Sequence, residues 1–279
     1  MILGIDIGGH AIKAGLLDKD KLIQTYRTDI RGDEDVSTFL DKVKSTIEKF
    51  PISHIQSIGI GVPGIVDPHS GEVFDIQNIS SLKKVALKEI LEVTFNKSVF
   101  VNNDANCFAL GENYFGLGTN YTHFLGVTLG TGLGTGIIIN KQLYSGVFCG
   151  AGEIGMLPYK GGILEEYTGS FFFEKHKITG EEAYNKAMGN DQKTLTLFNE
   201  FGKHLGYAIQ IMLHAYAPEA IVLGGAISKS FPFFESAMRL EVAKFPFKKQ
   251  LSDFEIFVSQ KNDMGILGAA ALCLQSGNK

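Results

Sequence analysis

The alternation of apolar and polar positions is clearest over residues 126–139, where four glycines at every second position separate two apolar runs. We predict a strand, a tight turn and a second strand here. Glycine suits such a turn because it lacks a Cβ and tolerates positive φ. Successive backbone N–H groups beside two Thr hydroxyls could bind an anion. The alternative is a glycine-rich hairpin that only packs, because a single glycine motif is a weak signal.

A second stretch, residues 2–17, repeats this design of strand, glycine turn and strand. Each copy is followed by a polar turn, at 18–21 and at 140–142, before further apolar residues. Two matching hairpins about 120 residues apart indicate a duplicated unit. Two such turns facing each other could hold a polyphosphate between them.

The rest of the chain alternates between the two kinds of apolar pattern. Helical spacing is found at 33–50, 85–95, 105–115, 195–217, 231–245 and 265–274. Short apolar strands are predicted at 55–62, 98–101, 220–223 and 255–258. Strands and helices that alternate in two halves favour an α/β fold.

Composition narrows the class of protein. A chain of 279 residues, of which 44% are hydrophobic, is long enough for two domains with buried cores. A net charge of −4 argues against a nucleic-acid surface, which needs a clustered basic face. We expect no membrane span, no secretory signal and a cytoplasmic location, because the chain has no long apolar run and opens directly in a strand. Three scattered cysteines argue against a disulfide framework or a cysteine zinc site.

Several strand ends carry candidate chemistry. Asp6 could reach a nucleotide-bound Mg²⁺, or it could be a turn aspartate that bonds its own backbone. Asp104 could be a general base for a hydroxyl substrate, or only the N-cap of the helix that follows. Glu153 could grip a polar ligand, or it could be a solvated loop charge. The Gly224-Gly225 strand end would suit the adenosine part of a nucleotide. A P-loop and a Rossmann fingerprint are both absent from the sequence.

The stretches DIGGHAIKAG, GIGVPGIVD, NNDANCFALGE, GVTLGTGLGTGIIINKQLYSG, GAGEIG and APEAIVLGGAIS occur in that order. Together they resemble the ROK family of sugar kinases over nearly the whole chain. The resemblance implies an α/β, duplicated ribonuclease H-like (actin/hexokinase-type) two-domain fold with a cleft between the domains. The expected domains are 1–115, with a C-terminal helix near 263–279 packing back on it, and 116–262. The resemblance also implies a sugar substrate, ATP, Mg²⁺ and a homodimer.

The resemblance also assigns roles to residues. Asp104 resembles the catalytic base, with Mg²⁺ near Asp6. The residues that resemble sugar contacts are Gly64, Asn78, Asn103, Asp104, Glu153 and Glu165. Those that resemble nucleotide contacts are Asp6, Gly8, Gly9, His10, Lys13, Thr131, Gly132, Gly224 and Gly225.

Three departures from the family pattern bear on the substrate. His10 stands where the family often has Thr, and Met156 stands where it has a His that binds zinc and touches the sugar. Residues 160–165 lack the family's zinc-binding cysteines, so we expect no zinc site and expect Met156 and Ile163 to fill the gap by packing.

The resulting functional prediction is phosphorylation of a hexose at its 6-hydroxyl. Glucose is the first candidate, and N-acetylmannosamine, fructose and N-acetylglucosamine are alternatives, with polyphosphate as an alternative donor. A non-catalytic sugar sensor is a rival class. A family repressor is disfavoured, because the phosphate turn begins at Gly4 and leaves no room for a DNA-binding segment.

Overall fold

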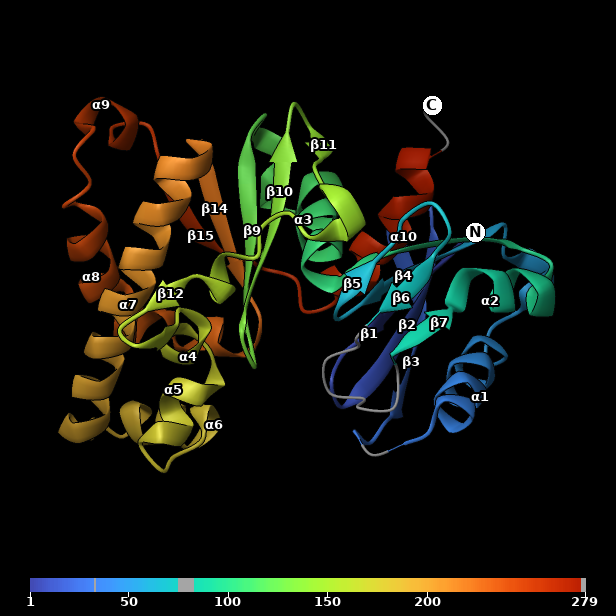
Figure 1. The fold of residues 1–279 in the computed structure, drawn as a ribbon, viewed down its shortest axis with the longest axis horizontal. Coiled ribbons are helices and arrows are strands. Elements are labelled where there is room, and N and C mark those ends of the chain that lie inside the picture. Colours follow the sequence, from blue (N-terminus) through green and yellow to red (C-terminus); the bar gives the residue numbers. More distant parts are fainter. Residues whose placement is uncertain (33, 75–82, 277–279) are drawn as a thin grey trace. The chain divides into compact units, whose positions relative to one another are not determined.

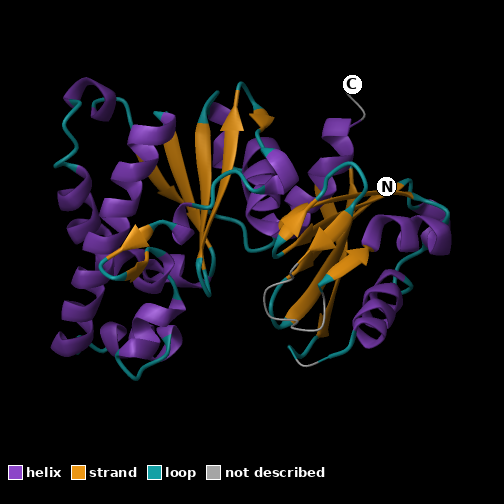
Figure 2. Cartoon of the chain, in the orientation of Figure 1, coloured by secondary structure: helices purple, strands orange, loops and turns teal. Residues whose placement is uncertain are grey.

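The protein has a mixed α/β fold, as the sequence predicts, and its elements fall into two compact units (Figures 1 and 2). The computed structural model describes residues 1–32, 34–74 and 83–276. The first unit comprises Met1–Asn120, Gly136–Ala151 and Gln260–Lys279, and the second comprises Tyr121–Thr135 and Gly152–Ser259. Neither unit is therefore a continuous stretch of chain.

The first unit is built on a five-stranded sheet with the order β3-β2-β1-β4-β8. β1, β2 and β3 are antiparallel neighbours, whereas β4 and β8 run parallel to β1. The hairpin predicted over residues 2–17 is the pair β1–β2, and the polar turn lies between β2 and β3. The strands are β1 (Ile2–Ile7), β2 (Ala11–Asp18), β3 (Lys21–Asp29), β4 (Ser57–Val62) and β8 (Ser98–Asn103).

A row of three glycines crosses this sheet and lets the last helix approach it closely. Gly15, Gly4 and Gly59 are paired in register on adjacent strands. A Cβ on Gly4 would collide with the backbone oxygen of Ile266, and one on Gly59 would collide with that of Ala269. Both oxygens belong to α10 (Met264–Ser276). The glycines are therefore required by the close approach of this helix rather than by strand geometry.

The other elements of the first unit surround the same apolar core. In α1, the Asp35 carboxylate accepts a hydrogen bond from the Thr38 N–H at 2.8 Å, and Phe39, Val43 and Ile47 are buried at a spacing of four. A small antiparallel sheet has the order β5-β6-β7. The bounds are α1 (Val36–Ile47), α2 (Leu87–Phe95), α3 (Asp104–Phe115), β5 (Ile65–Val66), β6 (Glu72–Phe74), β7 (Lys84–Ala86), and the 3₁₀ turns Ile52–His54, Leu117–Asn120 and Val147–Cys149.

The second sheet has the order β11-β10-β9-β14-β15, which repeats the order of the first. β14 runs parallel to both β9 and β15, as β4 runs parallel to β1 and β8. This repetition is the duplication that the two glycine hairpins predict. The strands are β9 (Phe124–Leu129), β10 (Leu133–Ile139), β11 (Gln142–Leu143), β14 (Ala220–Gly224) and β15 (Glu255–Val258).

The long helix α7 (Gln192–Tyr216) is the main helix of the second unit. It begins slightly before the predicted start because the Asp191 carboxylate accepts from the Thr194 N–H at 2.8 Å. Gly202 and Gly206 let α8 (Phe231–Val242) approach, since a Cβ on either would lie 2.5 Å from atoms of that helix. The remaining helices are α4 (Glu165–Thr168), α5 (Ser170–Lys175), α6 (Gly180–Met188), α9 (Lys248–Leu251), and the 3₁₀ turns Ile154–Met156 and Ala226–Ser230.

A short hairpin, β12 (Pro158–Tyr159) and β13 (Gly162–Ile163), precedes α4. Its two turn residues, Lys160 and Gly161, have φ angles of 47° and 82°. Among the described residues, no helix is both long and apolar enough to span a bilayer.

Candidate active site

The junction between β8 and α3 carries the two polar residues at the centre of the prediction. Asn103 is the N-cap of α3, and its Oδ1 accepts hydrogen bonds from the N–H groups of Ala105 at 2.9 Å and Asn106 at 3.3 Å. Asp104 is the first residue of the helix, and its Oδ1 also accepts from Ala105 N–H at 2.9 Å. The capping alternative for Asp104 is therefore wrong, because its neighbour caps the helix. The carboxylate lies in the first turn, where the helix dipole favours negative charge.

The Asn103 side chain also links two strand ends. Its Nδ2 donates to the carbonyl oxygen of Gly64 at 3.2 Å, and Gly64 follows β4 with a φ of 119°. Because β4 and β8 are parallel neighbours, their carboxyl ends meet at one edge of the sheet. Gly64, Asn103 and Asp104 therefore lie together, as predicted. Asn78 lies outside the described residues.

A second network, which sequence reasoning missed, supports this edge. Asn102 donates from Nδ2 to Ser145 Oγ at 3.3 Å, and its Oδ1 accepts from Asn106 Nδ2 at 3.0 Å. Asn102 is buried, with 6% of its surface exposed. The run of amides at 102–106 was the available signal, but the sequence could not indicate Ser145 as the partner.

The first turn that the sequence predicts to bind phosphate joins β1 to β2 at the same sheet edge. Its closing hydrogen bond runs from the Gly8 N–H to the Ala11 oxygen at 2.9 Å. Asp6 pairs with Lys13 across the two strands. Burial raises the pKa of the Asp6 carboxyl, and the charge of Lys13 opposes that shift only in part.

Asp6 also lies next to the first turn of α10, since a Cβ on Gly265 would be 2.7 Å from Asp6 Oδ2. The residues predicted for this turn, Gly8, Gly9, His10 and Lys13, sit together with Asp6 as expected from their spacing, with the His10 side chain exposed.

In the second unit, the turn after β9 carries Thr131 and Gly132. The Ser170 N–H contacts the oxygens of Gly130 and Thr131 at 2.9 and 3.1 Å, which ties the turn to the start of α5. A Cβ on Gly132 would collide with Oε2 of Glu165. The structure thus places one predicted sugar residue directly against one predicted nucleotide residue.

Of the two expected reasons for the glycines of this turn, the missing Cβ is confirmed at Gly132 and Gly136, and the positive φ is wrong. The described glycines with positive φ include Gly64, Gly152 and Gly225, but none of those at 130–136. Gly132 leaves room for the Glu165 carboxylate, and a Cβ on Gly136 would lie 2.5 Å from the Ala105 oxygen of α3. Close approach, rather than a left-handed backbone, accounts for these two glycines.

Gly224 and Gly225 end β14 beside the same turn. Gly224 pairs with Thr128 of β9, and Gly225 has a φ of 84°. A Cβ on Gly225 would collide with the backbone oxygen of Leu129, so glycine is required here both by φ and by space. Thr131, Gly132, Gly224 and Gly225 therefore gather at one edge of the second sheet.

The two glutamates of the second unit are close enough to affect each other. Partial burial raises the pKa of Glu153, and the charge of Glu165 raises it further. Glu165 opens α4, and its Oε2 would lie 3.3 Å from a Cβ on Gly155. Glu153 is exposed, as the alternative of a solvated loop charge predicts, and it lies close enough to Glu165 for the two charges to interact.

The stretch that departs from the family's zinc pattern is the β12–β13 hairpin. Within the described part of the chain, no group of three or more His, Cys, Asp or Glu residues is arranged to hold a metal ion. Met156 is 49% exposed, so the expectation that it fills the gap by packing is wrong. The hairpin instead contacts α7 through Tyr159, whose Oη lies 2.9 Å from Nδ1 of His204.

Two α/β units with the same strand order, each with a glycine turn at one sheet edge, define the class of duplicated actin/hexokinase-type folds. Comparison with known proteins gives the family: the ROK family model matches residues 2–169 and 160–276, and the chain belongs to this family.

Individual relatives agree with that class. A β-glucoside kinase of Klebsiella pneumoniae is 30% identical over 287 residues, covering 96% of this chain and 94% of the relative. The xylose repressor of Bacillus subtilis is 30% identical over 279 residues, covering 92% of this chain and 72% of the relative. The crystal structure of a ROK glucokinase from Streptomyces griseus, in complex with glucose and AMPPNP, matches with a TM-score of 0.86. It is 24% identical and covers 98% of this chain and 99% of that one, which confirms the actin/hexokinase-type fold.

Proposed function

We propose that the protein is an ATP-dependent sugar kinase that phosphorylates the 6-hydroxyl of a hexose, with glucose as the first candidate. The observation that carries the proposal is the position of Asp104 in the first turn of α3, while Asn103 serves as the cap. A positioned carboxylate of this kind can act as a general base. The activities named for the Klebsiella and Streptomyces kinases support the same class of reaction.

In this mechanism Asp104 accepts the proton of the 6-hydroxyl while the hydroxyl oxygen attacks the γ-phosphorus of ATP. The bond between the γ-phosphorus and the bridging oxygen breaks, and ADP leaves. Such transfers depend mainly on positioning and electrostatic stabilisation. The residues proposed to hold the other sugar hydroxyls are Gly64, Asn78, Asn103, Glu153 and Glu165.

The nucleotide is proposed to bind at the glycine turns. Around Gly130 there is room for a ligand, since a Cβ there would meet no atom within 4 Å. When bound, Mg²⁺ would neutralise part of the phosphate charge. Asp6 is the proposed carboxylate ligand of this ion, because a nearby cation would offset the cost of ionising the buried Asp6 carboxyl. The proposed nucleotide contacts are Asp6, Gly8, Gly9, His10, Lys13, Thr131, Gly132, Gly224 and Gly225.

The test is ATP turnover with Mg²⁺ and no added zinc, against glucose, mannose, fructose, N-acetylglucosamine and N-acetylmannosamine. Phosphorylation of one sugar well above the others supports the proposal and names the substrate. The contrary result is tight sugar binding in calorimetry while neither ATP nor polyphosphate supports turnover. That result would favour a sugar sensor, an alternative worth testing because a xylose repressor is among the relatives.

A second candidate substrate is a β-glucoside, and one feature of the first unit favours it. The exposed ring of Phe148 meets that of Phe74 edge-on at a centroid distance of 6.2 Å. Its neighbour Cys149 contacts the backbone of Asn103. An apolar group attached to a bound sugar could pack on this pair, so the panel should include an aryl β-glucoside. The family resemblance also leads us to propose a homodimer, which light scattering of the purified protein would test.

A further inference from the structure

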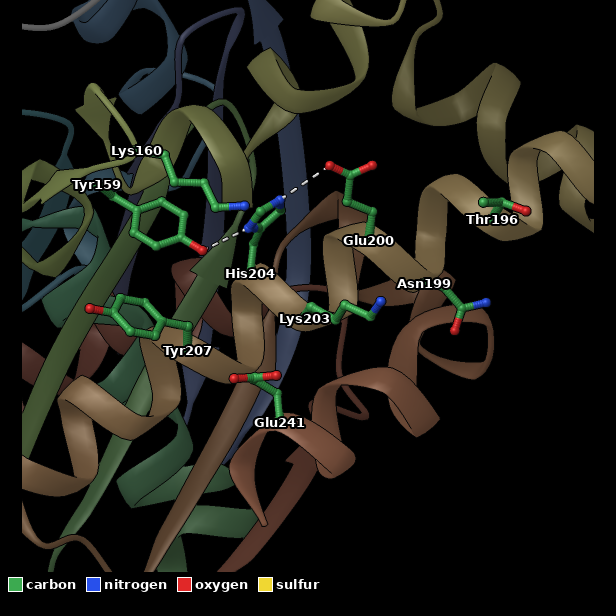
Figure 3. Close-up of a pocket in the computed structure, with 9 residues that line it drawn as sticks. All are labelled: Tyr159, Lys160, Thr196, Asn199, Glu200, Lys203, His204, Tyr207 and Glu241. Carbon is green, nitrogen blue, oxygen red and sulfur yellow. Dashed lines mark hydrogen bonds and ion pairs between the residues drawn. The ribbon is translucent and has the colours of Figure 1, made fainter. Parts of the chain in front are cut away.

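A polar pocket of about 510 Å³ lies in the second unit, where the β12–β13 hairpin meets α7 and α8 (Figure 3). Figure 3 shows Tyr159 and Tyr207 on one side of His204 and Glu200 on the other. His204 itself is only 3% exposed. The residues that line the pocket are Tyr159, Lys160, Thr196, Asn199, Glu200, Lys203, His204, Tyr207 and Glu241.

The short polar contact of His204 is with the hairpin. Its Nδ1 lies 2.9 Å from Tyr159 Oη, whereas its Nε2 lies 3.6 Å from Glu200 Oε1, which is beyond hydrogen-bond range. Burial lowers the pKa of His204, and the charge of Lys160 adds to that shift. A neutral imidazole with its proton on Nε2 can therefore accept a hydrogen bond from the Tyr159 hydroxyl at Nδ1.

Aromatic rings extend this contact from α7 to α4. The Tyr159 ring stacks on Tyr207 of α7 at 4.9 Å and meets Tyr167 of α4 edge-on at 5.1 Å. The Tyr167 hydroxyl donates to the Lys160 oxygen in the hairpin turn at 3.1 Å. These ring contacts and the Tyr167 hydroxyl therefore join the hairpin, α4 and α7 into one cluster.

This cluster lies within a few residues of Glu165. The Leu164 N–H donates to the Leu157 oxygen at 2.9 Å and closes the base of the hairpin. Glu165 follows directly and shares the four-residue helix α4 with Tyr167. Two strands of two residues each are too short to hold their own position, so their placement has to come from packing against α7.

We propose that Tyr159 and His204 form a positioning pair that fixes the hairpin on α7 and thereby places the Glu165 carboxylate for sugar binding. The inference rests on the proposed function, because it concerns the sugar contact of that same site. Neither residue touches the substrate in this role.

The test compares Tyr159→Phe and His204→Leu with Tyr207→Phe, which removes a hydroxyl from the same cluster without touching the pair. We expect the first two variants to raise the sugar KM about ten-fold, the equivalent of one lost hydrogen bond, with kcat and the ATP KM unchanged. We expect His204→Asn, which keeps an acceptor near the position of Nδ1, to restore much of the sugar KM. Tyr207→Phe should behave as the wild type.

Hydrogen exchange of residues 158–168 gives a readout that does not depend on turnover. Faster exchange there in Tyr159→Phe, together with the raised sugar KM, supports the proposal. An unchanged sugar KM, or a fall in kcat and thermal stability with no selective change in sugar KM, overturns it. If the wild type phosphorylates no sugar, the proposed function fails. In that case the sugar affinities of the wild type and the variants are compared by calorimetry instead of by KM. If the wild type binds no sugar at all, the positioning role is overturned as well.

Discussion

The carboxylate of Glu165 occupies the space where a side chain on Gly132 would begin. The turn after β9 is therefore in direct contact with the start of α4. A methyl group added at Gly132 would displace the Glu165 carboxylate.

We expect Gly132→Ala to displace the end of the Glu165 side chain and to raise the sugar KM about ten-fold, if Glu165 makes one hydrogen bond to the sugar. Thermal stability should change little, because the displaced group is the far end of a flexible side chain. Gly180→Ala is the matched control, since a Cβ there meets only ordinary contacts at 3.9 and 4.0 Å. If the sugar KM of Gly132→Ala equals that of the wild type, Glu165 does not contact the sugar as proposed.

Replacement of Asp104 tests the proposed base. Asp104→Ala should fold and bind sugar but lose turnover by about 10²–10⁴-fold, the usual contribution of a general base. Glu89→Ala is a suitable control, because Glu89 is an exposed acid in the first turn of α2. The measurement is kcat of the variant and the wild type in steady-state kinetics with the same sugar. Turnover near that of the wild type would show that Asp104 is not the base.

The glycine row under α10 predicts a stability effect. Gly59→Ala would force a methyl group against the backbone oxygen of Ala269, which cannot move without shifting the helix. We expect a loss of about 1–3 kcal/mol or more in the free energy of unfolding, as for other overpacked cores. Gly8→Ala, whose Cβ would meet the Ala11 oxygen at 3.6 Å, should cost less in stability. Urea unfolding of the two variants gives the comparison, and equal losses would contradict it.

The lowered pKa of His204 predicts a pH dependence of stability. The folded protein binds fewer protons at this site than the unfolded chain does, so His204 should cost stability as the pH falls below its ordinary pKa of about 6.5. The charged groups that face it are Lys160, Glu200 and Glu241. The variant His204→Asn should therefore lose less stability between pH 7.5 and 5.5 than the wild type. Parallel denaturation profiles for the two proteins would rule out this contribution.

Local patterns predicted the strands, the two glycine hairpins and their duplication, because period-two alternation and turn residues act over a few positions. They could not decide between Asn103 and Asp104 as the cap, since both residue types cap helices well and they are adjacent.

The sequence also could not say why Gly132 is glycine or why His204 is buried. The neighbours that answer these questions, Glu165 and Tyr159, are about 30 and 45 residues away and reach them only through tertiary packing.

The place of α10 has a consequence for synthesis of the protein. This helix follows the whole second unit in the sequence, yet it covers Gly4, Gly15 and Gly59 in strands made at the start. On a ribosome, the first unit must therefore wait with one face of its sheet uncovered while the whole second unit emerges. Domains commonly fold in order as they are made, and exposed apolar surface invites aggregation. Here the unit that is begun first is the one that can be completed only after the second unit has been synthesised.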